Sequence, residues 1–193
     1  MLSKNQMISK NKATPRDKAN VAGDNEKYLE FEVSGKQFAY HIRKVAEIME
    51  YPDVEPLPLS PGFFLGAINL RGDVIPIVDI AICLGLESQP ITKKTCVIIS
   101  EIECQNTVYQ VGNKVDLVTR VIDVSREQID EAPDLAGQLE HRVLVGLAKL
   151  DSRLLTILNI DNLLSQAQLE WFEKQHTTEQ SHCVGADLEV NDE

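Results

Sequence analysis

The segment GFFLGAINLRGDVIPIVDI, residues 62–80, places strong constraints on the fold. Two apolar runs, 62–70 and 74–80, are separated only by Arg71-Gly72-Asp73. Apolar runs of this length around a glycine-containing turn predict two buried strands joined as a tight hairpin. Glycine suits such a turn because it adopts positive φ angles that other residues resist. Pro76 has no backbone donor, so we expect it at a sheet edge or a bulge.

A weak internal repeat places a similar segment 80 residues further along the chain. GAINLRGDVIPIVDI at 66–80 aligns with GLAKLDSRLLTILNI at 146–160, with Gly, Leu, Ile and Ile in common and five further shared apolar positions. Upstream, Lys44-Val45 has a counterpart in Lys114-Val115 at an offset of 70. The repeat predicts two lobes of about five short strands each. Short strands separated by turns favour small β-barrels, which leave no exposed sheet edge.

The first half of the chain also contains a hairpin, a helical turn and an extended connection. Alternating apolar and polar residues predict a strand over 28–33, a turn at 34–36 and a return strand over 38–42. Apolar residues at three- and four-residue spacing predict a short helical turn within 42–49. Four prolines within 51–61 predict an extended connection there.

The second half contains a further strand pair, 96–99 with 108–111. Ser125-Arg-Glu-Gln128 has the spacing of a capping box and predicts a short helix that Pro133 would stop. Asp161 is predicted to cap a final helix. One face of that helix would be lined by Leu164, Ala167 and Trp171.

The composition restricts the classes of partner and compartment. The 193-residue chain has a formal net charge of -11 and a pI of about 4.8, which disfavours nucleic acid as a main partner because phosphates would repel it. The N-terminus has no signal-peptide pattern, and no apolar run reaches the ~20 residues needed to cross a bilayer. The cysteines show no C-x-x-C spacing and fit reduced thiols. We therefore expect a cytoplasmic protein without direct membrane insertion.

Residues 57–80, which read L-P-x-x-P-x-F-x-L-G-A-I-N-L-R-G-D-V-I-P-I-V-D-I, resemble the signature of the CheW family, the bacterial chemotaxis coupling proteins. The similarity extends over about residues 27–164 in matching order and spacing. Its other segments are Phe38–Ile48, Val115-Asp116 with Val118 and Val121, Gln128–Pro133, and Gly146–Leu155.

The resemblance implies a mostly β fold of two intertwined, five-stranded, SH3-like β-barrel lobes with short helices and a C-terminal helix. The CheW-like domain would span 26–165, with lobe one over about 26–90, lobe two over about 91–165, and strands exchanged between them. Residues 1–25 are predicted to be a disordered extension, and 166–193 the end of the C-terminal helix and a disordered acidic tail.

The resemblance also implies a function. CheW proteins are non-enzymatic adaptors that link the cytoplasmic tip of methyl-accepting chemoreceptors to the regulatory domain of the histidine kinase CheA, and so help to assemble the signalling array. By this resemblance the chain has no catalytic residues, cofactor or metal. It would lie in the cytoplasm, at the inner face of the membrane, through receptor arrays.

Particular residues carry these contacts by the same resemblance. Arg71 matches the arginine of the family's N-L-R-G motif, and Glu47 matches a glutamate that lies beside it on the receptor-facing side. Asn113 departs from the family, which usually has an apolar residue after Gly112, and if it lines the receptor groove it changes receptor choice. The remaining receptor- or kinase-binding positions are Val45, Ile48, Asn69, Gly72 and Val115.

Other interpretations of these residues and of the function stay open. Arg71 could be only the polar tip of a hairpin, and Asp79 is predicted to end a strand with a structural hydrogen bond. The chain could serve another chemosensory pathway, such as pilus-driven motility. It could also be a small hydrolase, with Cys96 as nucleophile and His41 or His141 as base. The four histidines form no metal-ligand spacing, so no metal is expected.

Overall fold

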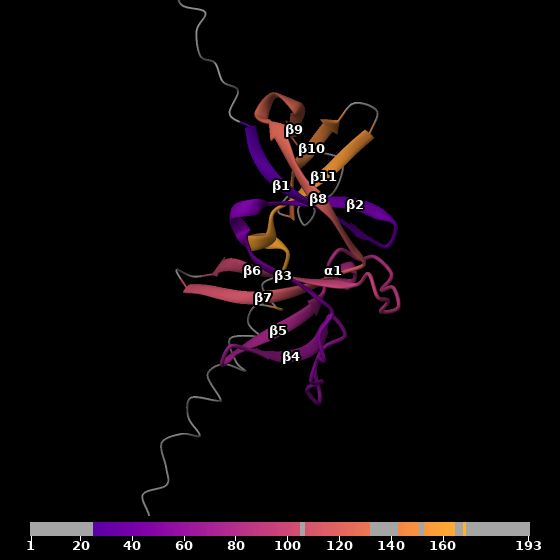
Figure 1. Cartoon of the computed structure of the whole chain (residues 1–193), viewed down its shortest axis with the longest axis vertical. Helices are drawn as coiled ribbons and strands as arrows, with labels where there is room; N and C mark the ends of the chain where they lie inside the picture. Colours follow the sequence, from indigo (N-terminus) through magenta and orange to yellow (C-terminus); the bar gives the residue numbers. More distant parts are fainter. Residues whose placement is uncertain (1–24, 105–106, 132–142, 151–152, 165–167, 169–193) are drawn as a thin grey trace, which may run out of the picture.

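The computed structural model describes residues 25–104, 107–131, 143–150, 153–164 and 168 (Figure 1). The predictions for residues 1–24, for Pro133, for His141 and for Ala167 and Trp171 lie outside these residues, as does that for the acidic tail.

The regular secondary structure of the described chain is mostly β-strand, which confirms the predicted fold class. Its one α-helix and three 3-10 helices are each a single short turn. In chain order the elements are β1 (Asn25–Val33), β2 (Lys36–His41), η1 (Ile42–Lys44), β3 (Val45–Glu50), β4 (Phe64–Leu70), β5 (Asp73–Asp79), α1 (Ile80–Cys83), β6 (Cys96–Cys104), β7 (Thr107–Val115), β8 (Leu117–Ser125), η2 (Arg126–Gln128), β9 (Ile129–Glu131), β10 (Leu144–Leu150), β11 (Arg153–Leu158) and η3 (Ile160–Asn162).

The strands form two sheets, one above the other in Figure 1. The six-stranded sheet has the order β8-β1-β2-β11-β10-β9, and the five-stranded sheet has the order β3-β6-β7-β5-β4. The chain enters the five-stranded sheet after η1 and leaves it at Asp116, between β7 and β8. β1 and β2 pair with strands from the C-terminal half, so the six-stranded sheet combines segments from both predicted lobes.

The 80-residue repeat is real in the structure. The hairpin of β4 and β5 in one sheet has its counterpart in β10 and β11 of the other, and each first strand carries a register shift that ends at a glycine, Gly66 or Gly146. A Cβ atom on Gly66 would lie 2.2 Å from the carbonyl oxygen of Glu55, and one on Gly146 would lie 2.3 Å from that of Asp130. Both glycines thus permit a close backbone approach that no other residue allows.

The predicted correspondence of Lys44-Val45 with Lys114-Val115, at an offset of 70 residues, is wrong. β5 pairs in parallel with β7 through Ile77 and Gly112, and β11 pairs in parallel with β2 through Ile157 and Ala39. Because Ile77 and Ile157 are repeat partners, Gly112 is the counterpart of Ala39. The match between residues 44–45 and 114–115 therefore has no structural basis.

Apolar side chains from both sheets share one core. Phe31 and Tyr40 of the six-stranded sheet, with ring centroids 4.7 Å apart, pack in a cluster with Val78 and Ile98 of the five-stranded sheet. Two smaller clusters lie within the individual sheets. Each large apolar side chain that is fully buried stabilises the fold by about 1.5–3 kcal/mol relative to exposure. The shared cluster therefore couples the folding of the two sheets.

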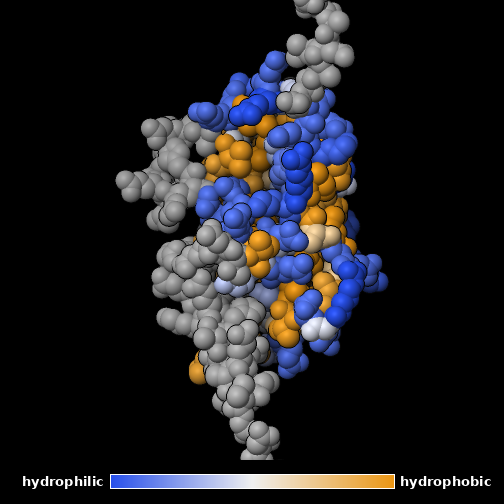
Figure 2. All heavy atoms as spheres, turned by 90° about the vertical axis from the view of Figure 1, so that its left-hand side faces the viewer, coloured by the Kyte–Doolittle hydropathy of each residue, from blue (hydrophilic) through white to orange (hydrophobic). Residues whose placement is uncertain are grey.

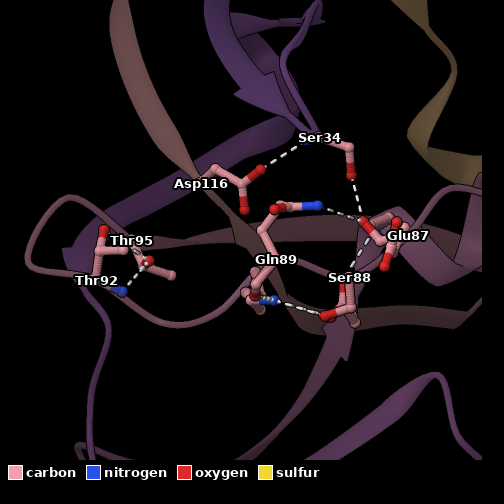
Figure 3. A network of polar contacts seen from close by, with 10 residues as sticks. Ser34, Glu87, Ser88, Gln89, Thr92, Thr95 and Asp116 are labelled. Atoms are coloured by element: carbon pink, nitrogen blue, oxygen red, sulfur yellow. Dashed lines mark hydrogen bonds and ion pairs between the residues drawn. The ribbon is translucent and has the colours of Figure 1, made fainter.

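Polar contacts tie the tip of the β1–β2 hairpin to the other sheet (Figure 3). The backbone N–H of Ser34 donates to Asp116 Oδ2 over 2.6 Å, and the Ser34 hydroxyl donates to the carbonyl oxygen of Glu87. The backbone N–H of Asp116 in turn donates to the carbonyl oxygen of Glu32 over 2.9 Å. The hairpin tip is thereby fixed both to the crossover and to the loop that follows α1.

A buried ion pair also fixes the loop that follows α1. Lys114 Nζ lies 2.9 Å from Asp79 Oδ2 and also donates to Ser88 Oγ over 2.9 Å and to the carbonyl oxygen of Gln89 over 2.8 Å. Asp79 ends β5 and accepts a hydrogen bond from the Ala81 N–H over 3.0 Å, which caps α1. The predicted structural role of Asp79 is confirmed, and the lysine that it binds was not foreseen.

A second buried carboxylate lies in the six-stranded sheet. Glu30 is 1% exposed and binds two guanidinium groups, Arg153 through both of its Nη atoms and Arg120 through Nε at 3.1 Å. The hydrogen bond from Arg153 is the main cause that lowers the pKa of Glu30, and burial opposes it. Glu30 is thus held ionised inside the sheet.

Several local predictions need correction. Residues 42–49 form only the single turn η1 before β3 begins at Val45. The capping box is confirmed by a 2.9 Å bond from the Ser125 N–H to Gln128 Oε1, but η2 ends at Gln128 because β9 follows. Pro76 lies on a strand inside its sheet, with its pairing to β7 starting at the next residue.

The predicted cap at Asp161 is also wrong. The side chain of Asn159 caps η3 by accepting from the Asp161 N–H over 3.1 Å. Asp161 instead binds Lys44 Nζ at 2.9 Å and the Glu103 N–H at 3.1 Å. It therefore joins the end of the six-stranded sheet to η1 and β6.

The substitution Gly66→Ala is expected to lower the free energy of unfolding by about 2–4 kcal/mol, because the new methyl group would clash with a backbone carbonyl that cannot move independently. Gly62→Ala is the matched control, since a Cβ there meets nothing within 4 Å. Urea unfolding of both variants measures the difference. Equal midpoints for the two variants would contradict the proposed close approach.

Glu30→Gln is expected to make the free energy of unfolding depend less on pH in the acidic range. A carboxyl group whose pKa is lower in the folded than in the unfolded chain stabilises the fold above its unfolded pKa, and this contribution disappears as the pH falls. The wild type should therefore lose more stability than Glu30→Gln between about pH 6 and about pH 3. Thermal unfolding across this range tests the effect, with Glu101→Gln on an exposed position of β6 as a control that should follow the wild type.

Candidate functional site

The candidate site is built on the turn between β4 and β5. Arg71 has a φ of 59° and Gly72 a φ of 102°, so both central residues of the turn are in the left-handed region. This is the conformation of a type I′ hairpin, whose twist matches that of the strands. Asn69 Oδ1 accepts a hydrogen bond from the Gly72 N–H over 3.0 Å and supports the turn. A left-handed arginine is strained, and such strain is concentrated at functional sites.

The arginine side chain reaches back to the opposite edge of the same sheet. Arg71 Nη2 lies 2.9 Å from Glu47 Oε2 and 3.1 Å from Oε1, and Glu47 is on the edge strand β3. The sheet must curl for its β4–β5 turn to meet β3. The structure thus brings together the two residues that the sequence singled out.

This ion pair is too exposed to account for much stability. The Arg71 side chain is 76% exposed and that of Glu47 is 31% exposed, and pairs of this kind contribute about 0–1 kcal/mol. A guanidinium group has five donors in a planar fork, so Arg71 keeps donors for a partner while Glu47 orients it. We call Glu47, Arg71 and the turn around them the Arg71 corner.

Partly exposed apolar residues flank Glu47 and Arg71 in the sequence. Ile48 on β3 is 41% exposed, and Val45 on the same strand is half-buried. Val74, which the sequence had not singled out as a contact, is 52% exposed directly after the turn. Its place in the apolar run had suggested a buried residue. Figure 2 shows one face of the molecule, where hydrophobic residues reach the surface in several patches between hydrophilic ones.

Two of the predicted contact residues are not on the surface. Val115 is 0% and Asn113 is 1% exposed, because β7 lies in the interior of its sheet. The Asn113 amide nitrogen lies 3.1 Å from the carbonyl oxygen of Ile98 and 3.3 Å from Ser100 Oγ. The amide thus satisfies its donors within the sheet, and the side chains of Asn113 and Val115, which were predicted to bind the receptor or the kinase, are buried.

Cys96 and His41, which were considered for nucleophilic chemistry, have separate hydrogen-bond partners. Cys96 Sγ donates to the carbonyl oxygen of Lys94 over 3.3 Å, whereas His41 Nδ1 accepts from the Arg43 N–H over 3.2 Å. Burial raises the pKa of the Cys83 thiol to about 12, and the nearby charge of Asp79 adds to this. At neutral pH Cys83 is therefore a thiol rather than a thiolate.

The described residues lack two further features. They contain no group of three or more histidine, cysteine, aspartate or glutamate residues that could hold a metal ion. None of their helices has the length and apolar character needed to cross a membrane.

Comparison with known proteins agrees with the geometry. A model of the CheW-like domain matches residues 27–168. The chain belongs to the CheW-like family. The probable chemotaxis protein CheW of Rhizobium etli is 30% identical over 148 residues, which cover 77% of this chain and 92% of that protein. The chemotaxis protein CheW of Klebsiella aerogenes is 31% identical over 151 residues, 77% of this chain and 89% of that protein.

A solved structure shares the fold. The crystal structure of the scaffolding protein TtCheW from Thermoanaerobacter tengcongensis matches with a TM-score of 0.64 and 26% sequence identity, over 72% of this chain and 92% of that one. The predicted family and fold class are confirmed. This CheW-like protein is a chemotaxis coupling adaptor, from a family of scaffolds and adaptors.

The sequence did not reveal the set of charges on the opposite sheet. Arg120 and Arg153 gather on Glu30 from strands far apart in the sequence. The 80-residue repeat could have drawn attention to Arg153. It makes this residue the counterpart of Asp73, which is two residues from Arg71.

Cys83 is expected to react with a thiol reagent at neutral pH at least about 100-fold more slowly in the native protein than in the unfolded chain, because it is buried and protonated. Mass spectrometry that resolves each cysteine measures the rates, and labelling in denaturant provides the reference. Rapid native labelling of Cys83 alone would contradict this account and indicate an activated thiolate.

Proposed function

We propose that this CheW-like protein couples chemoreceptors to a CheA-type histidine kinase through the Arg71 corner. The observation that carries the proposal is a strained, well-supported turn that presents an exposed arginine. The backbone conformation of Arg71 is costly, and its ion pair returns little stability. A binding role explains why the turn carries an arginine, since the fold alone does not require one.

The chemistry of the corner suits a helical receptor tip. Val45 and Ile48 supply apolar contact on the edge strand β3, and the Arg71 guanidinium, held by Glu47 of the same strand, supplies directional donors. An amphipathic helix can place its apolar face on such a surface while its polar rim meets the charges. Asn69 and Gly72 contribute by shaping the turn that presents Arg71.

The kinase contact in this proposal is made by the regulatory domain of CheA on a second surface of the two sheets. The protein joins the two partners without catalysis of its own. Through the receptor array it is held at the inner face of the membrane, in the cytoplasm. The buried, protonated Cys83 and the separately engaged Cys96 and His41 support a non-catalytic role.

Arg71→Glu is expected to leave the free energy of unfolding within about 1 kcal/mol of the wild type, since the pair is exposed. Receptor-dependent activation of the kinase should fall by at least about tenfold, because charge reversal places two carboxylates together and removes a dominant contact. A reconstituted assay with receptor membranes, CheA and this protein measures the effect.

Lys36→Glu is the matched control, because it makes the same charge change at an exposed position at the start of β2. It should couple like the wild type. The assignment of Arg71 fails if Arg71→Glu unfolds the protein, or if kinase activation is the same for both variants.

A further inference from the structure

The strand that carries Glu47 has a bulge directly before this residue. Val45 of β3 pairs with Ser100 of β6, and Glu47 pairs with the neighbouring Ile99, so one residue of β3 is left over. A bulge of this kind changes the direction in which the following side chains point. A shift of the pairing by one residue would move these side chains to the other face of the sheet. The register of β3 therefore decides whether Glu47 can reach Arg71.

β3 contributes little to fixing its own register. It is the edge strand of its sheet and pairs with β6. Along its six residues, Val45–Glu50, half-buried and exposed side chains alternate. Burial of one face is what usually specifies a register, and the burial of β3 is incomplete. A contact from outside the sheet can therefore stabilise the bulge in one place.

Such a contact lies directly before β3. Lys44 Nζ lies 2.9 Å from both carboxylate oxygens of Asp161. Asp161 Oδ1 also accepts a hydrogen bond from the backbone N–H of Glu103, at the end of β6, over 3.1 Å. Asp161 belongs to η3, which lies beside β6 in Figure 1, and its neighbour Ile160 is part of the core that the two sheets share. We call this ion pair the Lys44–Asp161 clamp, and it ties the start of β3 to β6 and to the buried turn η3.

The other sheet has the same bulge. In the strand orders of the two sheets, β8 has the place of β3, as the edge strand next to β1 in one sheet and next to β6 in the other. The pairing of β8 with β1 leaves out one residue between Val118 and Arg120, as the pairing of β3 with β6 does before Glu47. The bulge is therefore a feature of the repeated unit.

The repeated unit does not need the clamp in order to form this bulge. Leu117 precedes the bulge of β8 at the place that Lys44 has in the other sheet. Ala81 is 80 residues before Asp161 and is its counterpart in the repeat. Both partners of the ion pair are thus replaced by apolar residues. We conclude that the clamp serves the residue that follows it, Glu47, rather than the bulge as such.

We propose that Lys44 is a positioning residue, which together with Asp161 fixes the register of β3 and thereby the geometry of the Arg71 corner. The two side chains are 37% and 28% exposed, so the ion pair contributes more to orientation than to global stability. The inference rests on the proposed function for the identity of the partner that meets the corner. The register of β3 is a property of the chain itself and is measured without a partner.

Hydrogen exchange of the backbone amides, followed by NMR on the full chain, tests the register directly. Lys44→Met keeps the aliphatic part of the side chain but removes the charge. The β3 amides that bond to β6 are expected to exchange at least about threefold faster in this variant, because an edge strand without its anchor opens more often. Amides of β5 and β7 should exchange as in the wild type. Lys44→Arg keeps the positive charge and should restore the slow exchange of β3.

Two further variants control this measurement. Asp161→Asn retains an oxygen acceptor for the Glu103 N–H but lacks the charge, so it should have the same effect as Lys44→Met. Lys93→Met removes a positive charge at an exposed position before β6 and should have no effect. The proposal is overturned if Lys44→Met exchanges like Lys93→Met, or if Asp161→Asn leaves the exchange of β3 unchanged.

A double-mutant cycle tests whether Lys44 acts through Glu47. In the reconstituted assay with receptor membranes and CheA, Lys44→Met should raise the concentration of this protein that gives half-maximal kinase activation by at least about threefold. In a Glu47→Gln background the same change should have no further effect, because the charged group that the clamp positions is gone. An unchanged half-maximal concentration, or equal effects in both backgrounds, would overturn the proposal.

The clamp and the proposed function fail in different ways. If Arg71→Glu leaves kinase activation unchanged, the proposed function is wrong, whereas faster exchange of β3 in Lys44→Met still supports the clamp. If Arg71→Glu abolishes activation but Lys44→Met alters neither exchange nor activation, only the clamp is wrong.

Discussion

Side chains from both sheets meet in a common core, and the rest of the molecule is arranged around that contact. Phe31 and Tyr40 from one sheet pack with Val78 and Ile98 from the other. Neither sheet can bury these residues by itself. The six-stranded sheet joins β1 and β2 to β8 and to β9–β11. The segment between β2 and β8 forms the other sheet. The two sheets therefore act as one structural unit.

Buried charges constrain the way in which these sheets are held together. The pair of Lys114 and Asp79 fixes the loop after α1, and Glu30 draws together Arg120 and Arg153. Removing one partner from a buried pair typically costs about 3–5 kcal/mol, although the intact pair adds little net stability over apolar packing. A buried charge therefore favours only those arrangements of the strands and loops that give it hydrogen-bond or ion-pair partners. Lys114 meets this condition with three oxygen acceptors.

The exposed charges have a different role. Arg71 and Glu47 contribute little to stability, yet the turn that presents them is strained and closely supported by Asn69. Together with the family match, this contrast is the reason to regard the corner as a contact surface.

Local pattern was enough to predict those features that depend on neighbouring residues. The alternation in residues 28–33, the hairpin around Gly72 and the capping box at Ser125 all rest on interactions within a few positions, and all were found. The ordered series of motifs also identified the family. Arg71 and Glu47 were brought together from the resemblance alone, since they are 24 residues apart.

Tertiary structure decided everything that depends on distant strands. Apolar residues within 42–49 have helical spacing, but β6 provides a hydrogen-bonding partner and residues 45–50 become β3. Asn113 and Lys114 look like surface residues, yet β5 and β6 enclose them and supply acceptors for both. The sequence alone determined the strands and hairpins whose signal is local, such as the strand over residues 28–33 and the hairpin around Gly72. The pairing of those strands into two interlocked sheets depended on burial and hydrogen-bond satisfaction across the whole chain, which local periodicity does not encode.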